Sequence, residues 1–201
     1  MSSNTSYKTL SEPSSGVYKE KGSKFFSYAY PTDSEDDVKL FLHKIKKEHH
    51  SARHHCFAYK TGKDGAKFRA NDDGEPSGTA GRPILGQINS NSLTNVLIIV
   101  VRYFGGTLLG TSGLIRAYRS AAADAIQNGN IVIRTIKKKL QINFPYHMTN
   151  EVMKILKERG YHTFNQELRE SCKLIAEIPE ADIQLVSGKL KHLEGVSISI
   201  C

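Results

Sequence analysis

One stretch of the chain decides the fold: residues 93–129, with the sequence LTNVLIIVVRYFGGTLLGTSGLIRAYRSAAADAIQNG. It opens with an aliphatic run at residues 96–101, which is too short to cross a bilayer and is typical of a strand covered on both faces. Beyond several glycines, apolar residues recur at helical spacing from Leu114 through Tyr118 to Ala125 and share one face. The stretch therefore predicts a strand at the centre of a sheet, then a glycine-rich loop, then an amphipathic helix.

The glycine-rich loop predicts an anion-binding site. Glycines allow positive φ angles and the close approach of other atoms to the main chain. Where such a loop ends at a helix start, amide groups point outward at the positive end of the helix dipole. Thr111 and Ser112 are the expected N-caps of this helix. We predict the following anion-binding residues, three of them arginines: Arg102, Gly105, Gly106, Gly110, Thr111, Ser112, Gly113, Arg116 and Arg119.

A structural interpretation of the same loop stays open. The glycines would then only make a tight turn, and the arginines would be solvated. Glycine spacing alone is a weak signal, and no Gly-Lys-Ser/Thr sequence closes the loop as in a Walker motif. A nucleophile is not indicated, because Ser77, Thr79 and Ser112 have no evident base partner and the GxSxG elbow is absent.

A second loop is predicted at residues 71–81, NDDGEPSGTAG, which is longer than a plain connector needs. Asp72, Asp73 and Glu75 could hold magnesium against a phosphate if this loop meets the glycine-rich loop. The favoured interpretation is turn chemistry, in which aspartate side chains cap local amides. We therefore assign no catalytic residue, and the candidates are Asp72, Asp73, Glu75 and His54.

A cluster of metal-ligand residue types precedes that loop and consists of His49, His50, His54, His55 and Cys56. Zinc needs several converging ligands, but adjacent histidines on a strand point to opposite faces and no second cluster completes the shell. We expect no metal and no cofactor. His54 is expected at the edge of a cleft, and Cys56 is expected to be a small buried residue.

The composition is typical of a soluble globular protein, with 39% hydrophobic and 24% charged residues among 201. The net charge of +8 is compatible with anionic partners, although many basic proteins bind no nucleic acid. The three cysteines are too few for a disulfide framework, which favours a reducing, cytoplasmic setting. The N-terminus lacks the basic start and apolar core of a secretory signal, and no apolar run approaches the length of a membrane helix.

The remaining patterns predict an α+β protein of two domains. Residues 1–15 are expected to be a mobile start, residues 16–136 the first domain and residues 137–201 the second. In the first domain, the patterns outside the decisive stretch predict two strands within 17–30, a helix at 33–47, strands at 56–59 and 67–70, and a short helix at 83–88. In the second domain, they predict strands at 140–144, 161–168, 171–178 and 196–200, and helices at 146–159 and near 183–193. This βαββαβ order is the ferredoxin-like pattern.

Four segments make the sequence recognisable: residues 52–58 (ARHHCFA), 72–81 (DDGEPSGTAG), 101–106 (VRYFGG) and 109–118 (LGTSGLIRAY). Together they resemble the YigZ/IMPACT family, and the resemblance is dense and ordered over roughly residues 15–130. It extends to the second domain, which looks like the small C-terminal domain of the bacterial members.

The resemblance implies a fold and a setting. The first domain would be of the kind shared by domain IV of elongation factor G, a small-subunit ribosomal protein (domain-2-like) and the GHMP kinases, and the second domain would be ferredoxin-like. Eukaryotic members of the family regulate translation initiation by competing for a ribosome-associated activator of the amino-acid-starvation kinase. They carry a different N-terminal interaction domain that this sequence lacks, so that specific partner is not transferred to this chain.

The leading hypothesis is therefore a cytoplasmic, non-enzymatic protein that binds RNA or a ribosomal or translation-factor surface and modulates translation. Arg102, Arg116 and Arg119 would contact phosphates. Tyr103 or Phe104 would stack a base. One alternative is a phosphate- or nucleotide-binding enzyme, a phosphotransferase or hydrolase, that uses both loops. The other is a protein-interaction scaffold recognised through the second domain. No membrane partner is expected, and the oligomeric state is not predicted.

Overall fold

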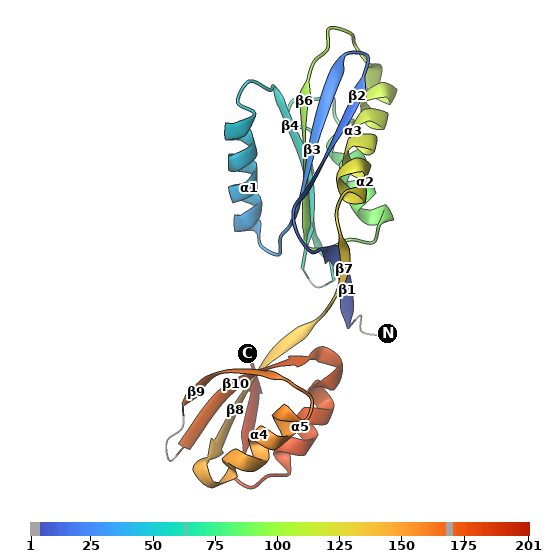
Figure 1. Cartoon of the computed structure of the whole chain (residues 1–201). Coiled ribbons are helices and arrows are strands. Elements are labelled where there is room, and N and C mark those ends of the chain that lie inside the picture. Colours follow the sequence, from blue (N-terminus) through green and yellow to red (C-terminus); the bar gives the residue numbers. More distant parts are fainter. Residues whose placement is uncertain (1–4, 63, 168–170) are drawn as a thin grey trace. The chain divides into compact units, whose positions relative to one another are not determined.

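The computed structural model describes residues 5–62, 64–167 and 171–201 and has a mixed α/β architecture (Figure 1). The chain divides into two compact units: Ser6–Arg134 forms one, and the other contains Thr135–Cys201. Each unit has its own sheet and its own hydrophobic core. Within the described part of the chain, no helix combines the length and apolar character needed to span a membrane.

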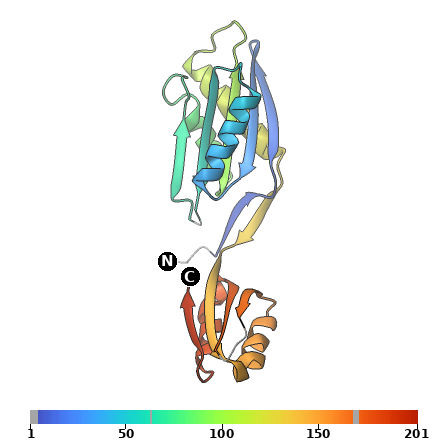
Figure 2. The ribbon, with the colours of Figure 1, turned by 90° about the vertical axis from the view of Figure 1, so that its left-hand side faces the viewer.

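The first unit is built around a five-stranded antiparallel sheet with the strand order β2-β3-β6-β4-β5 (Figures 1 and 2). Its strands are β2 (Ser14–Glu20), β3 (Ser23–Pro31), β4 (His54–Thr61), β5 (Lys67–Asn71) and β6 (Val96–Tyr103). Helix α1 (Glu35–Glu48) covers one face, and α2 (Gly81–Ser90) and α3 (Gly110–Gln127) cover the other. The predicted strands and helices of this unit are all present, with bounds shifted by a few residues.

Strand β6 lies in the centre of the sheet and is buried on both faces, as the aliphatic run predicted. Leu97 and Ile99 pack in the cluster beneath α1. Their neighbours Ile98 and Val100 pack in the cluster beneath α2 and α3. Because side chains alternate along a strand, the same order directs Arg102 toward α2 and α3.

Helix α3 begins earlier than predicted and without the predicted cap. Its N-cap residue is Leu109, and no side chain in the described part of the protein caps it. Thr111 and Ser112 lie inside the helix and are exposed, so the prediction that they are N-caps is wrong. Leu109 packs against the core that α3 covers. This partial burial of Leu109 favours a helix start here over one capped by Thr111 or Ser112.

Part of the segment expected to be a mobile start, residues 1–15, forms strands instead. Strand β1 (Ser6–Leu10) pairs with β7 (Ile131–Thr135) in a two-stranded sheet, and β2 begins at Ser14. Residues 1–4 lie outside the described residues. Leu10 is fully buried, and Thr9 Oγ1 donates a hydrogen bond to the carbonyl oxygen of Asn95 at 2.9 Å. The partners of β1 are remote in sequence, so its polar composition alone did not indicate a strand.

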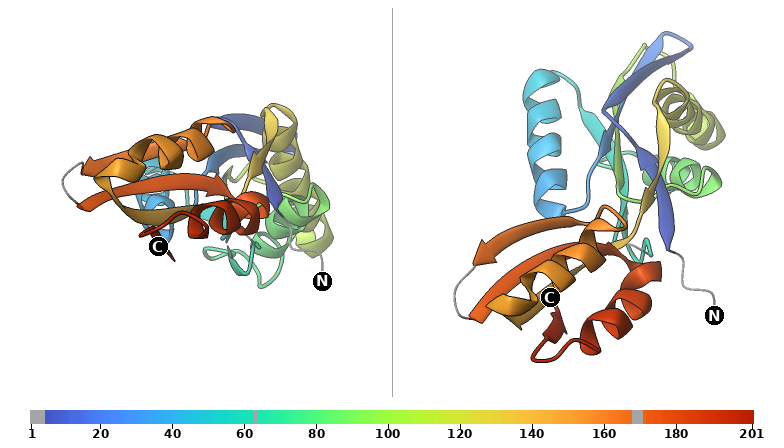
Figure 3. Two further views of the ribbon diagram at one scale, coloured as in Figure 1. Left: turned by 90° about the horizontal axis from the view of Figure 1, so that it is seen from below. Right: turned by 60° about the horizontal axis from the view of Figure 1, so that its bottom comes forward.

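The second unit is an antiparallel four-stranded sheet of order β11-β8-β10-β9 with two helices packed on it (Figures 1 and 3). Its elements are β8 (Lys137–Pro145), α4 (Thr149–Lys157), β9 (His162–Glu167), β10 (Ser171–Pro179), α5 (Ile183–Lys191) and β11 (Ser197–Ile200), with short 3-10 turns at Tyr146–Met148 and Glu180–Asp182. The predicted βαββαβ order of elements is present. Residue 168, which was predicted to end the second strand, lies outside the described residues.

Candidate functional site

The residues singled out by the sequence gather at one end of the sheet in the first unit. There β4 begins and β6 ends, and the register pairs His54 with Arg102. Two loops adjoin these strand ends: the acidic loop, residues 71–81, and the glycine loop, residues 104–109. Both loops therefore border the same pair of strands.

Glu75 ties the acidic loop to β6 and α3 through a buried network. Its carboxylate, which is 3% exposed, accepts hydrogen bonds from Arg102 Nη1 and from the Tyr118 hydroxyl, each at 2.8 Å. The Arg102 side chain is 7% exposed, so this is a buried ion pair. Removal of one partner from such a pair leaves an uncompensated charge in the core. The network therefore holds the acidic loop against the sheet.

Cys56 lies beside this network and is not arranged as a nucleophile. Its Sγ is 2.9 Å from the carbonyl oxygen of Asp72 and 3.3 Å from the hydroxyl oxygen of Tyr118. Burial raises the pKa of the Cys56 thiol far above its ordinary value, and burial also raises the pKa of Tyr118. The thiolate is the reactive form of cysteine, so a thiol with a raised pKa is a poor nucleophile. Cys56 is a small buried residue, as predicted.

Asp72 caps the start of α2. Its carboxylate accepts hydrogen bonds from the backbone N–H groups of Gly78 at 2.9 Å, Ala80 at 2.9 Å and Gly81 at 2.8 Å. Burial acts to raise the pKa of this carboxyl, but the three backbone donors and the Arg82 charge hold the pKa below its ordinary value. These contacts agree with the interpretation of the acidic loop as turn chemistry.

Asp73 fixes the start of β4. Its Oδ2 accepts a hydrogen bond from the backbone N–H of His55 at 2.8 Å, and its carbonyl oxygen lies 3.0 Å from Nδ1 of His54. A carbonyl oxygen only accepts, so Nδ1 of His54 holds a proton and Nε2 is left available. All three carboxylates of the acidic loop thus bond to protein groups. Among the described residues, no group of three or more His, Cys, Asp or Glu side chains is placed to hold a metal ion.

The first glycine of the glycine loop is required by packing. A Cβ on Gly105 would lie 1.9 Å from the carbonyl carbon of Gly22, in the turn between β2 and β3. The backbone N–H of Gly105 also donates a hydrogen bond to Ser23 Oγ at 3.2 Å. Gly106 and Gly110 have φ angles of 86° and 70°, and no described atom lies within 4 Å of a Cβ at either position. The loop is therefore held at its start and open beyond it.

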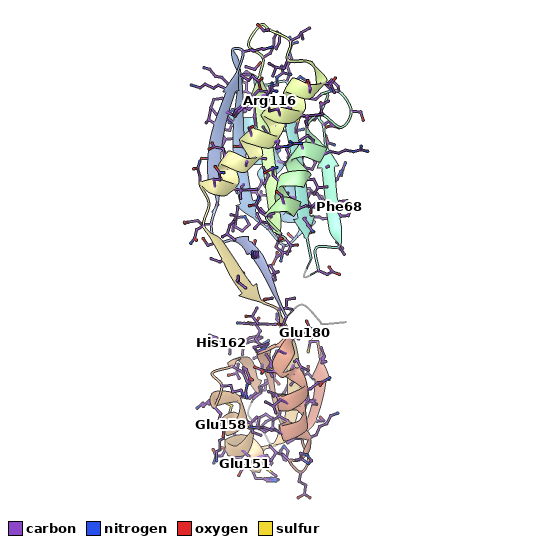
Figure 4. All side chains as sticks on the ribbon, turned by 90° about the vertical axis from the view of Figure 1, so that its right-hand side faces the viewer. Phe68, Arg116, Glu151, Glu158, His162 and Glu180 are labelled. Carbon is purple, nitrogen blue, oxygen red and sulfur yellow. The ribbon has the colours of Figure 1, made fainter. Side chains whose placement is uncertain are left out.

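The three arginines predicted to bind phosphate occupy different environments. Arg102 is buried and paired with Glu75. Arg116 projects from α3 with its side chain 62% exposed, and its Nη2 lies 2.6 Å from a carboxylate oxygen of Glu20 (Figure 4). Arg119 is exposed on the same helix. The structure therefore places Arg116 and Arg119 at the surface and Arg102 beneath the glycine loop.

A cavity of about 540 Å³, which we call the basic cavity, lies beside Arg102. Arg53 and His54 line it from the start of β4, and Phe104 and Leu108 line it from the glycine loop. Phe104 is 58% exposed and Leu108 is 82% exposed. His54 therefore lies at the edge of a cleft, as predicted.

A second cavity of about 400 Å³ lies on the α1 side of the same strand ends and shares Tyr103 and Phe104 with the basic cavity. Tyr103, Phe26 and His49 give it an aromatic lining. The His49 ring is held by two hydroxyl groups, that of Tyr28 at 2.6 Å and that of Tyr103 at 3.0 Å. Tyr103 and Phe104 therefore border both a basic and an aromatic cavity.

Sequence reasoning missed three residues that shape this site: Arg53, Leu108 and Glu20. An arginine directly before a predicted strand and a leucine within a glycine-rich loop were signals that could have been used for the first two. Glu20 pairs with Arg116 across 96 residues, and no local pattern indicates such a contact.

Comparison with known proteins agrees with the resemblance carried by the motifs. Residues 21–126, more than half of the chain, match the model of the Impact N-terminal domain. This chain belongs to the IMPACT family. An IMPACT family member from Haemophilus influenzae is 35% identical over 172 residues, which cover 85% of this chain and 84% of that protein. The IMPACT family member YigZ from Escherichia coli is 30% identical over 190 residues, which cover 94% of this chain and 93% of YigZ.

A solved structure also matches. It is described as the crystal structure of a hypothetical protein, and it superposes with a TM-score of 0.75 at 30% sequence identity. The match covers 98% of this chain and 96% of that one. The architecture of this IMPACT family chain thus has a counterpart over nearly its whole length.

Proposed function

We propose that the protein binds RNA, free or within the ribosome, and modulates translation in the cytoplasm. The observation that supports this most is Phe104, an aromatic side chain that is 58% exposed. It follows directly on β6, and the residue after it, Gly105, is held by the β2–β3 turn. Exposed aromatic rings beside cations form the usual platform on which unpaired bases stack.

Exposed cations lie on the two elements next to the glycine loop, the β2–β3 turn and helix α3. Lys21 and Lys24 are exposed in and beside the turn that packs on the glycine loop. Arg116 and Arg119 are exposed on α3, the helix that follows the glycine loop. We propose that these four cations contact phosphates while Phe104 stacks a base.

Arg116 can exchange its protein partner for a phosphate. Its ion pair with Glu20 lies at the surface, where such pairs contribute little to stability. A backbone phosphate carries the same single negative charge as the carboxylate, and it offers the guanidinium two oxygens that an arginine fork can match. Arg102 keeps its buried pair with Glu75 and would meet RNA only through the basic cavity.

Family membership and strand order support the finer parts of the proposal. We propose that residues 16–136 have the fold of domain IV of elongation factor G and that residues 137–201 are ferredoxin-like. In the second unit the first and third strands, β8 and β10, are neighbours in the sheet centre, which is the arrangement expected of a split βαβ unit. A translation-related role follows from what the resemblance implies.

The test is fluorescence anisotropy with a single-stranded RNA of mixed sequence, titrated at several salt concentrations. We expect the affinity to fall steeply with salt, and the slope to lessen in Arg119→Ala. Phe104→Ala should weaken binding about tenfold through loss of one stacked base. Matched controls are Arg69→Ala and Phe68→Ala, because both residues are exposed on the edge strand β5. Figure 4 labels Phe68 on this strand. Binding that ignores salt, or equal losses in test and control variants, would contradict the proposal.

A phosphate-binding enzyme is the second candidate, and one observation favours it. His54 lines the basic cavity together with Arg53 and Arg102, and its Nε2 is not the nitrogen that bonds to Asp73, so a base and two arginines border one cavity. Hydrolysis of a phosphate ester that is abolished in His54→Gln but kept in His50→Gln would establish this candidate.

A further inference from the structure

The guanidinium of Arg102 has a donor without an acceptor. Nη1 bonds to Glu75, but Nε is buried and has no hydrogen-bond partner among the described residues. A buried donor on a charged side chain is costly to leave unpaired. Native proteins leave few such groups, so the unpaired Nε calls for a partner from outside the chain.

Two aromatic rings cover the guanidinium, and only one of them is fixed. The rings of Phe25 and Phe104 are each centred 5.6 Å from Cζ of Arg102. Phe25 is fully buried in the core, whereas Phe104 is 58% exposed. Rotation of the Phe104 side chain would therefore open Arg102 to solvent without any change in the strands.

The basic cavity has the lining of an anion site. Arg53, His54 and Arg102 border it, and Ser51 adds a hydroxyl group. None of the described residues that line it is acidic. The charge of Arg102 is balanced by Glu75, so the charge of Arg53 is the one not balanced within this set. Nε2 of His54 is available because Nδ1 is committed to the carbonyl oxygen of Asp73.

This geometry favours a phosphate at the end of a nucleic-acid chain over a phosphate in the interior of the chain. The Arg102 side chain is only 7% exposed, so a ligand can approach it from one side only, through the basic cavity. A phosphodiester is bonded to a nucleoside on each side, which hinders its entry into a cavity that is open on one side. A phosphate monoester is bonded to one nucleoside and can enter with its free oxygens first. Arginine forks match two phosphate oxygens at once, which makes a pair of arginines a fitting receptor.

We propose that the basic cavity binds a phosphate monoester group, which Arg53 and Arg102 hold by its oxygens beside Nε2 of His54. Phe104 then packs on the nucleoside that carries the phosphate. The proposal rests on the proposed function for the source of its ligand, the phosphorylated end of an RNA strand. A free mononucleotide has the same chemistry, so the experiment includes both.

The experiment compares three RNAs of identical sequence, with a 5′-phosphate, with a 3′-phosphate or with hydroxyl groups at both ends. We expect one phosphorylated RNA to bind at least about tenfold more tightly than the hydroxyl-ended RNA. Arg53→Ala and His54→Gln should remove that difference. The control Arg69→Ala, on the edge strand β5, should leave the difference intact.

The second arm of the experiment uses adenosine 5′-monophosphate and adenosine as probes in calorimetry. Binding of the monophosphate but not of adenosine, lost in Arg53→Ala, supports the inference even if no RNA binds, and in that case the proposed function fails alone. Equal affinity for the three RNAs together with no binding of the monophosphate overturns the inference and leaves RNA binding standing. Because Arg53 is exposed, its variant is expected to fold.

Discussion

The acidic loop and the glycine loop border the same strand ends but use their polar groups differently. In the acidic loop, Asp72, Asp73 and Glu75 all bond to groups of the protein. In the glycine loop, Phe104 and Leu108 are exposed, and the helix behind it starts without a side-chain cap from any described residue. One loop is closed by its own contacts, and the other faces outward.

A dense motif is therefore not by itself a binding site. The two loops are equally conspicuous in the sequence because turns, caps and ligand sites use the same residue types. What separates them is whether each polar group already has a partner in the fold. We therefore expect changes in the acidic loop to reduce stability and exposed changes in the glycine loop to reduce binding.

Glu75→Ala is the strongest test of the acidic loop as a structural brace. The change leaves the buried Arg102 guanidinium without its carboxylate, which for a buried ion pair costs about 3–5 kcal/mol. We expect the free energy of unfolding, measured by urea denaturation, to fall by that amount. Glu75→Gln keeps a hydrogen-bond acceptor and should reduce it by less. A change within about 0.5 kcal/mol, as at an ordinary surface position, would contradict the brace.

Gly105→Ala and Gly106→Ala form a matched pair within the glycine loop. Gly105→Ala places a Cβ 1.9 Å from a backbone atom of Gly22, and overpacking of this kind costs about 1–3 kcal/mol, here at the upper end because backbone must move. Gly106→Ala meets no described neighbour and only strains a φ of 86°, at a cost of about 1–2 kcal/mol. Urea denaturation should rank Gly105→Ala as the more destabilising. The reverse order would show that the turn does not fix the start of the loop.

Asp72→Ala tests the acidic loop through its cap on α2. The variant loses the acceptor for the backbone N–H groups of Ala80 and Gly81, and loss of an N-cap side chain costs about 1–2 kcal/mol. Amide hydrogen exchange at these two residues should accelerate along with the drop in stability. Asp64→Ala is the control, because Asp64 is exposed and accepts a hydrogen bond from Ala66, only two residues away. Equal losses in the two variants would mean that the cap is unimportant.

The fold was predictable where the signal is local and periodic. The aliphatic side chains of β6 point to both faces of the sheet, so both faces had to be covered. In the structure, α1 covers one face and α2 and α3 cover the other. The spacing of apolar residues indicated the helices, and the turn formers indicated the two loops. The start of α3 was misplaced because burial of Leu109, a tertiary effect, prevailed over the capping preference of Thr111 and Ser112.

The contacts of the candidate site could not be predicted, because they join distant segments. Glu75 and Arg102 are 27 residues apart, and their pairing depends on the register of β4 against β6. The sequence indicated an acidic and a basic motif but not that one neutralises the other. In the same way, the role of Gly105 depends on the approach of Gly22, which only the assembled sheet brings about.

A fall in pH should lower the free energy of unfolding through His55 and Asp72, on the acidic-loop side of the site, and leave the glycine loop unaffected. Burial lowers the pKa of His55 below its ordinary value of 6.5, against the opposing effects of the His49 carbonyl and the Asp73 charge. As pH drops below 6.5, the unfolded chain takes up a proton that the folded chain resists, so stability falls until the folded-state pKa has been passed. The lowered pKa of Asp72 acts in the same direction at lower pH. The stability that Asp72 contributes is fully present above pH 3.8 and is lost as the pH falls through the folded-state pKa.

His55→Gln removes the first of these effects and provides the measurement. Urea denaturation at about pH 7 and about pH 5.5 should show a larger loss of stability in the wild type than in His55→Gln, and His50→Gln should behave as the wild type because His50 is exposed. The effect is the smallest of those described here, since burial of His55 is opposed by two nearby groups. Arginine stays charged throughout this range, so the contribution of Arg119 to RNA affinity should not change while the protein remains folded. An equal loss in wild type and His55→Gln would show that the acidic-loop side of the sheet is no more sensitive to pH than the rest of the chain.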